Sequence, residues 1–320
     1  MRAEQNREIR LKRRPEGAAT GDDFELAASA IPKPAEGQAL VQTIYFSVDP
    51  YMRGRMNAGR SYVDNFEVGG RITGGSVGQV IESAVPGLSE GDYVSGFGGW
   101  TEYFVGNAAT LTTVDPELAP LSTYLGVMGM PGATAYFGLL DIGQPGEGET
   151  IFVSAASGAV GSIACQIGKI VGCRVVGSVG SPEKVAWLED IAGIDAALNY
   201  KEYATTAELR AAIAQRCPDG IDVYFENVGG MHLEAALSLM NQRGRIPLCG
   251  MISGYNADEP VPGPSNLGIA IGKRLRLEGF IVSDYYAQLP KFQEEMGHWI
   301  ADGQVHYEET IVEGVEHAPE

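Results

Sequence analysis

The second half of the chain alternates between short apolar runs and amphipathic segments, and this alternation restricts the fold more than any other feature. An apolar run at 150–155, TIFVSA, precedes a segment at 159–171 whose apolar residues share one helical face. The alternation predicts strands at 173–180, 196–200, 220–229, 245–252 and 274–284, helices at 181–193, 206–218 and 231–244, and a helix followed by an edge strand at 291–305. Strands joined through helices are parallel, so we expect a doubly wound α/β sheet.

The first 125 or so residues have a different pattern. β-branched and aromatic runs at 37–50, 75–83 and 91–105 are separated by Gly, Pro and Asp turns. The glycines between Gly69 and Gly78 suggest the bends of a small twisted barrel. We therefore expect a β-rich domain, to which the edge strand near residue 305 returns.

Length and charge exclude several classes of protein. With 320 residues the chain is long enough for two domains, and its formal net charge of −18 argues against nucleic acid as a partner. No apolar run reaches the roughly 18–20 residues of a membrane helix. The N-terminus lacks an apolar signal core, so we expect a cytoplasmic protein that does not span a membrane. The basic cluster Arg10, Lys12, Arg13 and Arg14 is interpreted as a solvated edge strand and turn.

Histidine and cysteine, the usual ligands of a catalytic zinc, do not occur before Cys165. The β-rich domain therefore offers no such ligand, and we expect no metal site. The four cysteines show neither C-x-x-C spacing nor a secretory context, which argues against a disulfide framework. Cys165 and Cys173 are interpreted as two buried small hydrophobes.

A glycine-containing turn joins the strand at 150–155 to the following helix. Against the dinucleotide fingerprint G-x-G-x-x-G, residues 156–161 read A-S-G-A-V-G, so Ala156 takes the first glycine position. Gly158 lets the backbone approach a pyrophosphate, and Gly161 lets the helix pack close to the strand. Alone, the motif is equally compatible with a structural turn. Between a strand and a helix it predicts a bound dinucleotide.

The end of the next strand distinguishes NADPH from NAD. An NAD site has an Asp or Glu about 20 residues beyond the turn, but here the strand ends in Gly180, Ser181 and Pro182. Ser181 can donate to a 2′-phosphate and Lys184 can neutralise it, which favours NADPH. The alternative is an ordinary surface lysine, although a lysine in a first helical turn is unfavourable without an anion nearby.

Charge that develops on oxygen during a reduction needs a stabilising donor, and a tyrosine hydroxyl is the candidate here. Tyr255, in CGMISGYN, follows the strand at 245–252, and ligands bind at such strand ends. Tyr51 and Tyr62 lie on a long polar and aromatic loop of the first domain that is suited to roof a cleft. The chain has fourteen tyrosines, so packing is the alternative role for each.

Several stretches together resemble one known family. The resemblance is carried by SVDPYMRGRM, PGLSEGDYV, GMPGATAYFGL, AASGAVGSIACQIGKIVG, GSPEK, YFENVGG and CGMISGYN. They are similar to the zinc-free medium-chain dehydrogenase/reductases, in the group of prostaglandin reductases, leukotriene hydroxydehydrogenases, alkenal reductases and bacterial curcumin reductases. The resemblance implies a GroES-like β domain of residues 1–126 and 284–320, split by an inserted Rossmann NADPH-binding domain of residues 127–283.

The resemblance also implies the residues of the site. Tyr255 matches the tyrosine assigned to the substrate oxygen, and Tyr51 and Tyr62 match substrate-binding positions. The implied cofactor-binding residues are Gly158, Ala159, Val160, Gly161, Ser181, Lys184, Tyr200, Asn227, Cys249, Gly250, Ile252, Ser253, Phe280, Ile281 and Val282.

The implied activity is NADPH-dependent reduction of the C=C bond of small α,β-unsaturated ketones or aldehydes, with hydride transfer to the β-carbon. The alternatives are an NADPH quinone reductase and an NADPH-binding redox sensor with little turnover. Relatives continue beyond EGVEHAPE (313–320) through a helix and a closing strand that supply an asparagine to the cofactor. Without that segment the site would be incomplete, which is the basis of the sensor alternative. The resemblance further leads us to expect a homodimer, paired through GFIVSD at 279–284.

Overall fold

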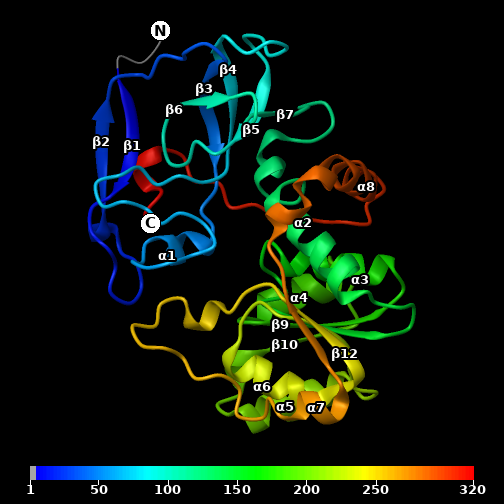
Figure 1. Ribbon diagram of the computed structural model, residues 1–320. Coiled ribbons are helices and arrows are strands. Elements are labelled where there is room, and N and C mark those ends of the chain that lie inside the picture. Colours follow the sequence, from blue (N-terminus) through cyan, green and yellow to red (C-terminus); the bar gives the residue numbers. More distant parts are fainter. Residues whose placement is uncertain (1–4) are drawn as a thin grey trace. The chain divides into compact units, whose positions relative to one another are not determined.

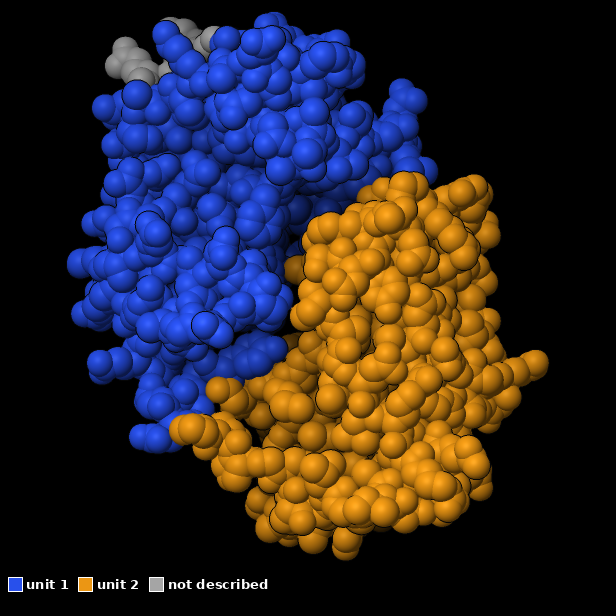
Figure 2. All heavy atoms as spheres, viewed as in Figure 1, with its two compact units in different colours: residues 1–125, 255–259, 309–320 blue, residues 126–254, 260–308 orange. Residues whose placement is uncertain are grey.

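The computed structural model describes residues 5–320 and divides into two compact units. Unit 1 comprises residues 1–125, 255–259 and 309–320, and unit 2 comprises residues 126–254 and 260–308 (Figure 2). The chain thus enters unit 2 at Gly126, leaves it briefly at Tyr255, returns at Pro260 and leaves it again after Glu308. Among residues 5–320, no helix is both long and apolar enough to cross a membrane.

Unit 2 is built on a six-stranded parallel sheet with the strand order β10-β9-β8-β11-β12-β13. Its strands are β8 (Thr150–Ser154), β9 (Arg174–Val179), β10 (Ala196–Asn199), β11 (Ile221–Phe225), β12 (Met240–Leu248) and β13 (Arg276–Gly279). The central strand β8 is buried along its whole length, as expected for a strand covered on both faces. The predicted doubly wound α/β sheet is confirmed.

Helices cover both faces of this sheet. Those of unit 2 are α2 (Met130–Phe137), the π-helical turn η3 (Gly138–Gly143), α3 (Gly161–Ile170), α4 (Pro182–Asp190), α5 (Thr206–Arg216), α6 (Gly230–Leu239), α7 (Ile269–Lys273) and α8 (Leu289–Ala301), with short 3-10 turns η4 (Tyr200–Glu202), η5 (Ile252–Gly254) and η6 (Val282–Gln288). Figure 1 shows α3 on one face of the sheet and α5, α6 and α7 on the other. Local sequence sets the helix starts: Thr205 and Glu208 form a reciprocal capping box before α5.

The helix predicted at 231–244 ends earlier than expected, because tertiary hydrogen bonds fix the residues after it. α6 stops at Leu239, and β12 begins at Met240. The Asn241 amide donates to the carbonyl of Asp219 at 3.0 Å and to the Asp222 carboxylate at 2.8 Å. These bonds hold the chain after Leu239 beside strand β11, so the helix does not continue.

The predicted edge strand near residue 305 is absent from residues 5–320, and the segment 284–308 packs within unit 2. The ring of Phe292 on α8 is fully buried and lies 5.5 Å from the ring of Tyr136. The His306 backbone exchanges two hydrogen bonds with the Gln166 side chain of α3, at 2.7 and 2.9 Å. A side-chain amide thus takes the place of a strand partner. The domain boundaries expected from the sequence differ from the two units chiefly at these residues.

Unit 1 contains a five-stranded antiparallel sheet with the order β6-β3-β4-β5-β7 and a two-stranded sheet β1-β2 (Figure 1). Its elements are β1 (Asn6–Leu11), η1 (Gly21–Asp23), β2 (Phe24–Ser29), β3 (Gln38–Phe46), α1 (Tyr51–Arg55), β4 (Ser76–Ser83), β5 (Tyr93–Gly96), β6 (Tyr103–Asn107), β7 (Thr112–Thr113), η2 (Leu121–Leu125) and η7 (Val315–His317). The predicted strands at 37–50, 75–83 and 91–105 correspond to β3, β4 and the pair β5 and β6.

The N-terminal basic cluster is engaged within unit 1. Arg10 pairs with Glu8, Arg13 pairs with Asp23 at 2.7 Å, and Arg14 donates to the Met56 carbonyl at 2.7 Å. The interpretation as a solvated edge strand and turn fits Lys12 and Arg13, which are exposed, whereas Arg10 and Arg14 are half-buried. Cys165 and Cys173 are both buried, as predicted.

Candidate functional site

The glycine-containing turn leaves backbone donors exposed between β8 and α3. Gly158 and Ala159 are exposed and Val160 is half-buried, whereas Gly161 is buried. The N–H groups of Ala159, Val160 and Gly161 form no hydrogen bond within the described part of the chain. Three unpaired donors at the N-terminal end of a ten-residue helix form a ready anion site.

Close packing explains which residues of the fingerprint must be small. A Cβ on Gly161 would lie 2.3 Å from the carbonyl oxygen of Ala155, so only glycine fits there. Ala156 fits at the first glycine position because its methyl group faces Gly177 on β9, which has no side chain. A Cβ on Gly177 would lie only 2.8 Å from the Ala156 methyl group. Gly177, in RVVGSV, therefore compensates for the missing first glycine of the fingerprint.

Ser181 caps the helix that follows β9. Its hydroxyl oxygen accepts from the Lys184 N–H at 3.4 Å, and Pro182 occupies the first helical turn. Lys184 is exposed and forms no ion pair within residues 5–320. The cap fixes the first turn of α4, and the Ser181 hydroxyl also hydrogen-bonds to the Glu183 carboxylate, whose pKa it helps to lower.

Tyr200 follows β10 and rests on a buried histidine that the sequence does not single out. The rings of Tyr200 and His232 meet edge to face with centroids 5.0 Å apart. His232 Nε2 and Ser178 Oγ lie 2.9 Å apart, and both residues are buried. Burial lowers the pKa of His232 to about 4, so its ring is neutral near pH 7. We call residues 180–181, 184 and 200–201 the β9–β10 ridge.

A second residue missed from the sequence is Glu226, directly after β11. Its carboxylate is fully buried, and one oxygen accepts from the Val228 and Gly229 N–H groups at 2.6 and 2.9 Å and from the Ser154 hydroxyl at 3.0 Å. Burial raises the pKa of Glu226. Asn227 is held in turn, because its amide donates to the Ser154 carbonyl at 2.7 Å. An acid at the end of the buried run VYF, residues 223–225, is the signal that could have identified it.

The same carboxyl-terminal edge carries the loop after β12. The Cys249 and Gly250 N–H groups donate to the Glu226 carbonyl at 2.9 and 3.0 Å. The Ser253 hydroxyl donates to the Val228 carbonyl at 2.6 Å. Residues 226–229 and 249–253 are thus joined through their backbones, and we call them the stapled loops. Burial raises the pKa of Cys249 to about 12, so its thiol is protonated near neutral pH.

Phe280, Ile281 and Val282 follow the last strand of the sheet. The Phe280 ring lies against Gly138, where a Cβ would approach it to 2.4 Å. Ile281 is exposed and Val282 begins the 3-10 turn η6. Because all six strands are parallel, every cofactor residue expected from the sequence follows a strand at one edge of the sheet.

The three tyrosines expected on the substrate side belong to unit 1. Tyr51 begins α1, and Tyr62 is 67% exposed in the loop that follows. Arg55 anchors this loop, because its guanidinium donates to the Asp64 carbonyl at 2.8 Å and to the Thr73 carbonyl at 2.7 Å. Tyr255 is half-buried in the short segment 255–259.

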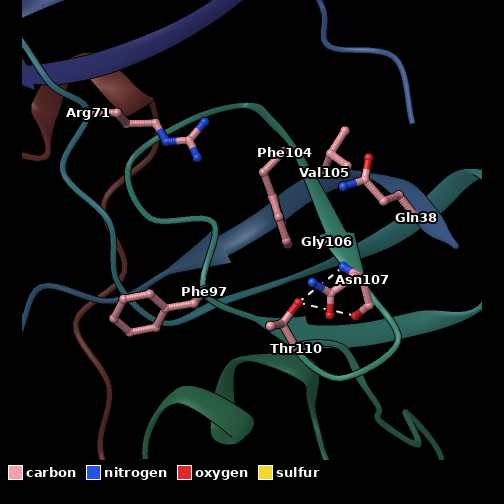
Figure 3. A pocket seen from close by; sticks show the side chains of 8 residues that line it. All are labelled: Gln38, Arg71, Phe97, Phe104, Val105, Gly106, Asn107 and Thr110. Atoms are coloured by element: carbon pink, nitrogen blue, oxygen red, sulfur yellow. Dashed lines mark hydrogen bonds between the residues drawn. The ribbon is translucent and has the colours of Figure 1, made fainter. Parts of the chain in front are cut away.

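A cavity of about 260 Å³ lies in unit 1 along β6 (Figure 3). None of the residues expected at the site lines it. Its lining residues are Gln38, Arg71, Phe97, Phe104, Val105, Gly106, Asn107 and Thr110. Within residues 5–320, no group of three or more His, Cys, Asp and Glu side chains is placed to hold a metal ion.

Comparison with known proteins identifies relatives along the whole chain. A family model described as the N-terminal domain of oxidoreductase matches residues 7–114, and one described as zinc-binding dehydrogenase matches residues 159–300. The NADPH-dependent curcumin reductase of Escherichia coli is 44% identical over 99% of this chain and 92% of its own length. The NADP⁺-dependent 2-alkenal reductase of Nicotiana tabacum is 46% identical over 98% of this chain and 92% of its own length.

A solved structure of CurA from Vibrio vulnificus in complex with NADPH superposes with a TM-score of 0.92 at 43% identity, covering 98% of this chain and 93% of that one. These similarities confirm the resemblance expected from the sequence motifs. The chain belongs to the zinc-free medium-chain dehydrogenase/reductase family, in the group that contains the curcumin and alkenal reductases.

Proposed function

We propose that the protein is an NADPH-dependent reductase that saturates the C=C bond of α,β-unsaturated ketones and aldehydes. The observation that carries this proposal is the similarity, over 98% or more of the chain, to enzymes named for curcumin and 2-alkenal reduction. The strand ends of unit 2 fit the cofactor. The unpaired N–H groups of Ala159 and Val160 suit a pyrophosphate, and Ser181 and Lys184 suit a 2′-phosphate.

NADPH, when bound, would supply the hydride that reaches the β-carbon of the substrate. The task of the protein is then to hold the carbonyl oxygen, where negative charge collects as an enolate. We assign this donor role to the Tyr255 hydroxyl, which can also pass a proton toward the α-carbon. The stapled loops, which end at Ser253, would line the nicotinamide side of the site and exclude water.

The proposal is tested by following NADPH consumption with a panel of trans-2-alkenals, cyclic enones and benzoquinones, with products identified by mass spectrometry. We expect saturated aldehydes and ketones as the main products. NADH serves as the control cofactor and should be used less efficiently. The unsubstituted saturated aldehydes serve as control substrates and should not be reduced.

Two outcomes would contradict the proposal. Faster turnover of benzoquinones than of every enone would assign the protein as a quinone reductase, which needs no protonation at carbon. Tight NADPH binding without turnover of any substrate in the panel would favour a redox sensor. Rates of NADPH consumption and product identities distinguish the two reductases, and NADPH binding without turnover identifies the sensor.

A further inference from the structure

Gly180, at the end of β9, makes room for two side chains that follow β10. A Cβ on Gly180 would lie 3.3 Å from Cε1 of Tyr200 and 3.3 Å from Cε of Lys201. Nζ of Lys201 lies 3.6 Å from the same point. The stem of Lys201 therefore runs across the backbone that directly precedes Ser181, and any larger residue at position 180 would displace it.

The backbone that carries Lys201 is fixed on both sides. The Lys201 N–H donates to the Asn199 side chain at 3.3 Å, which caps the short turn η4. The neighbouring ring of Tyr200 packs against His232, which is itself held by Ser178. Because the turn is held by a cap and by a buried ring contact, Lys201 leaves it in a defined direction.

Lys201 carries a charge that the protein itself does not compensate. The described residues give it no ion pair, although the chain has 41 acidic and 23 basic side chains. The nearest acid in sequence, Glu202, accepts from the Asn199 amide at 3.3 Å. Lys184 is equally without an ion pair. Two uncompensated ammonium groups thus belong to one small ridge of a protein whose net charge is −18.

We propose that Lys201 is a specificity-determining residue that binds the 2′-phosphate of the cofactor together with Lys184. The inference rests on the proposed NADPH site and adds a residue to it. A phosphate monoester carries a charge of about −1.5 to −2 near pH 7, so a single lysine leaves part of that charge unneutralised. A second ammonium group, that of Lys201 beside Gly180, supplies the remainder.

The test compares two fragments that differ only in the 2′-phosphate, adenosine 2′,5′-bisphosphate and 5′-AMP, by isothermal titration calorimetry of the full chain. We expect Lys201→Met to weaken binding of the bisphosphate about tenfold, as for the loss of one charge-assisted contact, and to leave 5′-AMP binding within about twofold. Lys201→Arg should retain most of the affinity. Lys291→Met, on the exposed side of α8, is the matched control and should change neither.

The outcomes separate this inference from the proposed function. If the wild-type protein binds both fragments equally, the proposed NADPH site is wrong. If the wild type prefers the bisphosphate and Lys201→Met keeps that preference, Lys201 has no role in specificity. An equal loss for both fragments would show that Lys201 only supports the fold of the turn, and would also overturn the inference.

Discussion

The stapled loops and the β9–β10 ridge lie along the same edge of one sheet but are built in different ways. The stapled loops are held by hydrogen bonds that converge on one buried residue, Glu226. Its carboxylate accepts from the Val228 and Gly229 N–H groups and from the Ser154 hydroxyl, and its backbone carbonyl accepts from the Cys249 and Gly250 N–H groups. The ridge presents exposed side chains, Lys184 and Lys201, on a buried and neutral base formed by Ser178 and His232. Hydrogen bonds fix the backbone of the stapled loops, whereas the ridge exposes two positively charged side chains.

This difference indicates a division of labour along the site. A reacting ring must be placed within fractions of an ångström, which suits loops whose backbone cannot move without leaving buried groups unpaired. A phosphate can be held by flexible ammonium groups, because their attraction varies slowly with distance. We therefore expect changes in the stapled loops to affect stability and kcat, and changes in the ridge to affect cofactor choice.

The largest expected effect is that of Glu226→Ala, which removes the acceptor at the centre of the stapled loops. The N–H groups of Val228 and Gly229 and the Ser154 hydroxyl would lose their partner, at about 1–3 kcal/mol each, and we expect the free energy of unfolding to fall by about 4 kcal/mol. Urea denaturation followed by tryptophan fluorescence measures this, since Trp187 and Trp299 both lie in unit 2.

Glu226→Gln is the matched control for that change. The amide keeps an oxygen that can accept from Val228 and Gly229, so most of the stability should remain. Faster hydrogen exchange at these two amides in the alanine variant, without change elsewhere in the sheet, would localise the defect to the stapled loops. Equal stability of the alanine variant and the wild type would remove Glu226 from the centre of this region.

The next effect in size is expected for Tyr255→Phe, two residues beyond the stapled loops. Loss of one donor to a developing oxyanion costs about 2.7–4 kcal/mol, so kcat for an enone should fall about 10²- to 10³-fold. The dissociation constant for NADPH should stay the same, because the change concerns the substrate. Steady-state kinetics together with calorimetric titration separates the two quantities. An unchanged kcat would exclude Tyr255 from the chemistry.

The sequence predicts the two regions unequally, and the reason is physical. The β8–turn–α3 unit is predictable because an apolar run, small residues and a helical stripe are all local signals. Glu226 and His232 are not, because their roles depend on contacts with Ser154 and Ser178 on other strands. Each is a single polar residue among apolar neighbours in the sequence, so neither forms a periodic pattern from which its role could be predicted.

Long-range contacts also explain two of the differences between the predicted and the observed secondary structure. Asn241 bonds to Asp219 and Asp222 and so ends α6 early, although the local sequence continues the helical pattern. The backbone of His306 is satisfied by the Gln166 side chain instead of a neighbouring strand. In each case a side-chain amide distant in sequence supplies the hydrogen bonds that decide the backbone conformation. A further difference is the strand predicted at 274–284, which ends at Gly279 and is followed by the 3-10 turn η6.

The buried His232, which contacts Tyr200 of the ridge, predicts that the stability of the fold depends on pH. The pKa of His232 is lowered from 6.5 to about 4 in the folded protein, so below pH 6.5 the unfolded chain binds the proton first. Stability should therefore be complete above pH 6.5 and fall by up to about 3 kcal/mol as pH drops through 4. Urea midpoints of the wild type and His232→Gln between pH 7.5 and 4.5 measure this. The exposed His298→Gln variant, the control, should follow the wild type, and a His232→Gln curve parallel to the wild type would contradict the prediction.

The smallest effect is expected for Glu183→Gln, at an exposed residue between Ser181 and Lys184 of the ridge. Glu183 lies in the first turn of α4 beside Ser181, and hydrogen bonds from its own backbone and from Ser181 lower the pKa of its carboxyl group. Its negative charge opposes a 2′-phosphate bound at the same turn. Across several ångströms of water this repulsion is weak, so the substitution should tighten adenosine 2′,5′-bisphosphate binding only about threefold. Calorimetric titrations at low and high salt should show the gain shrinking as salt rises, with no gain for 5′-AMP. A gain that is equal for both fragments would mean that Glu183 influences the turn and not the phosphate, and the ridge would then discriminate through its lysines alone.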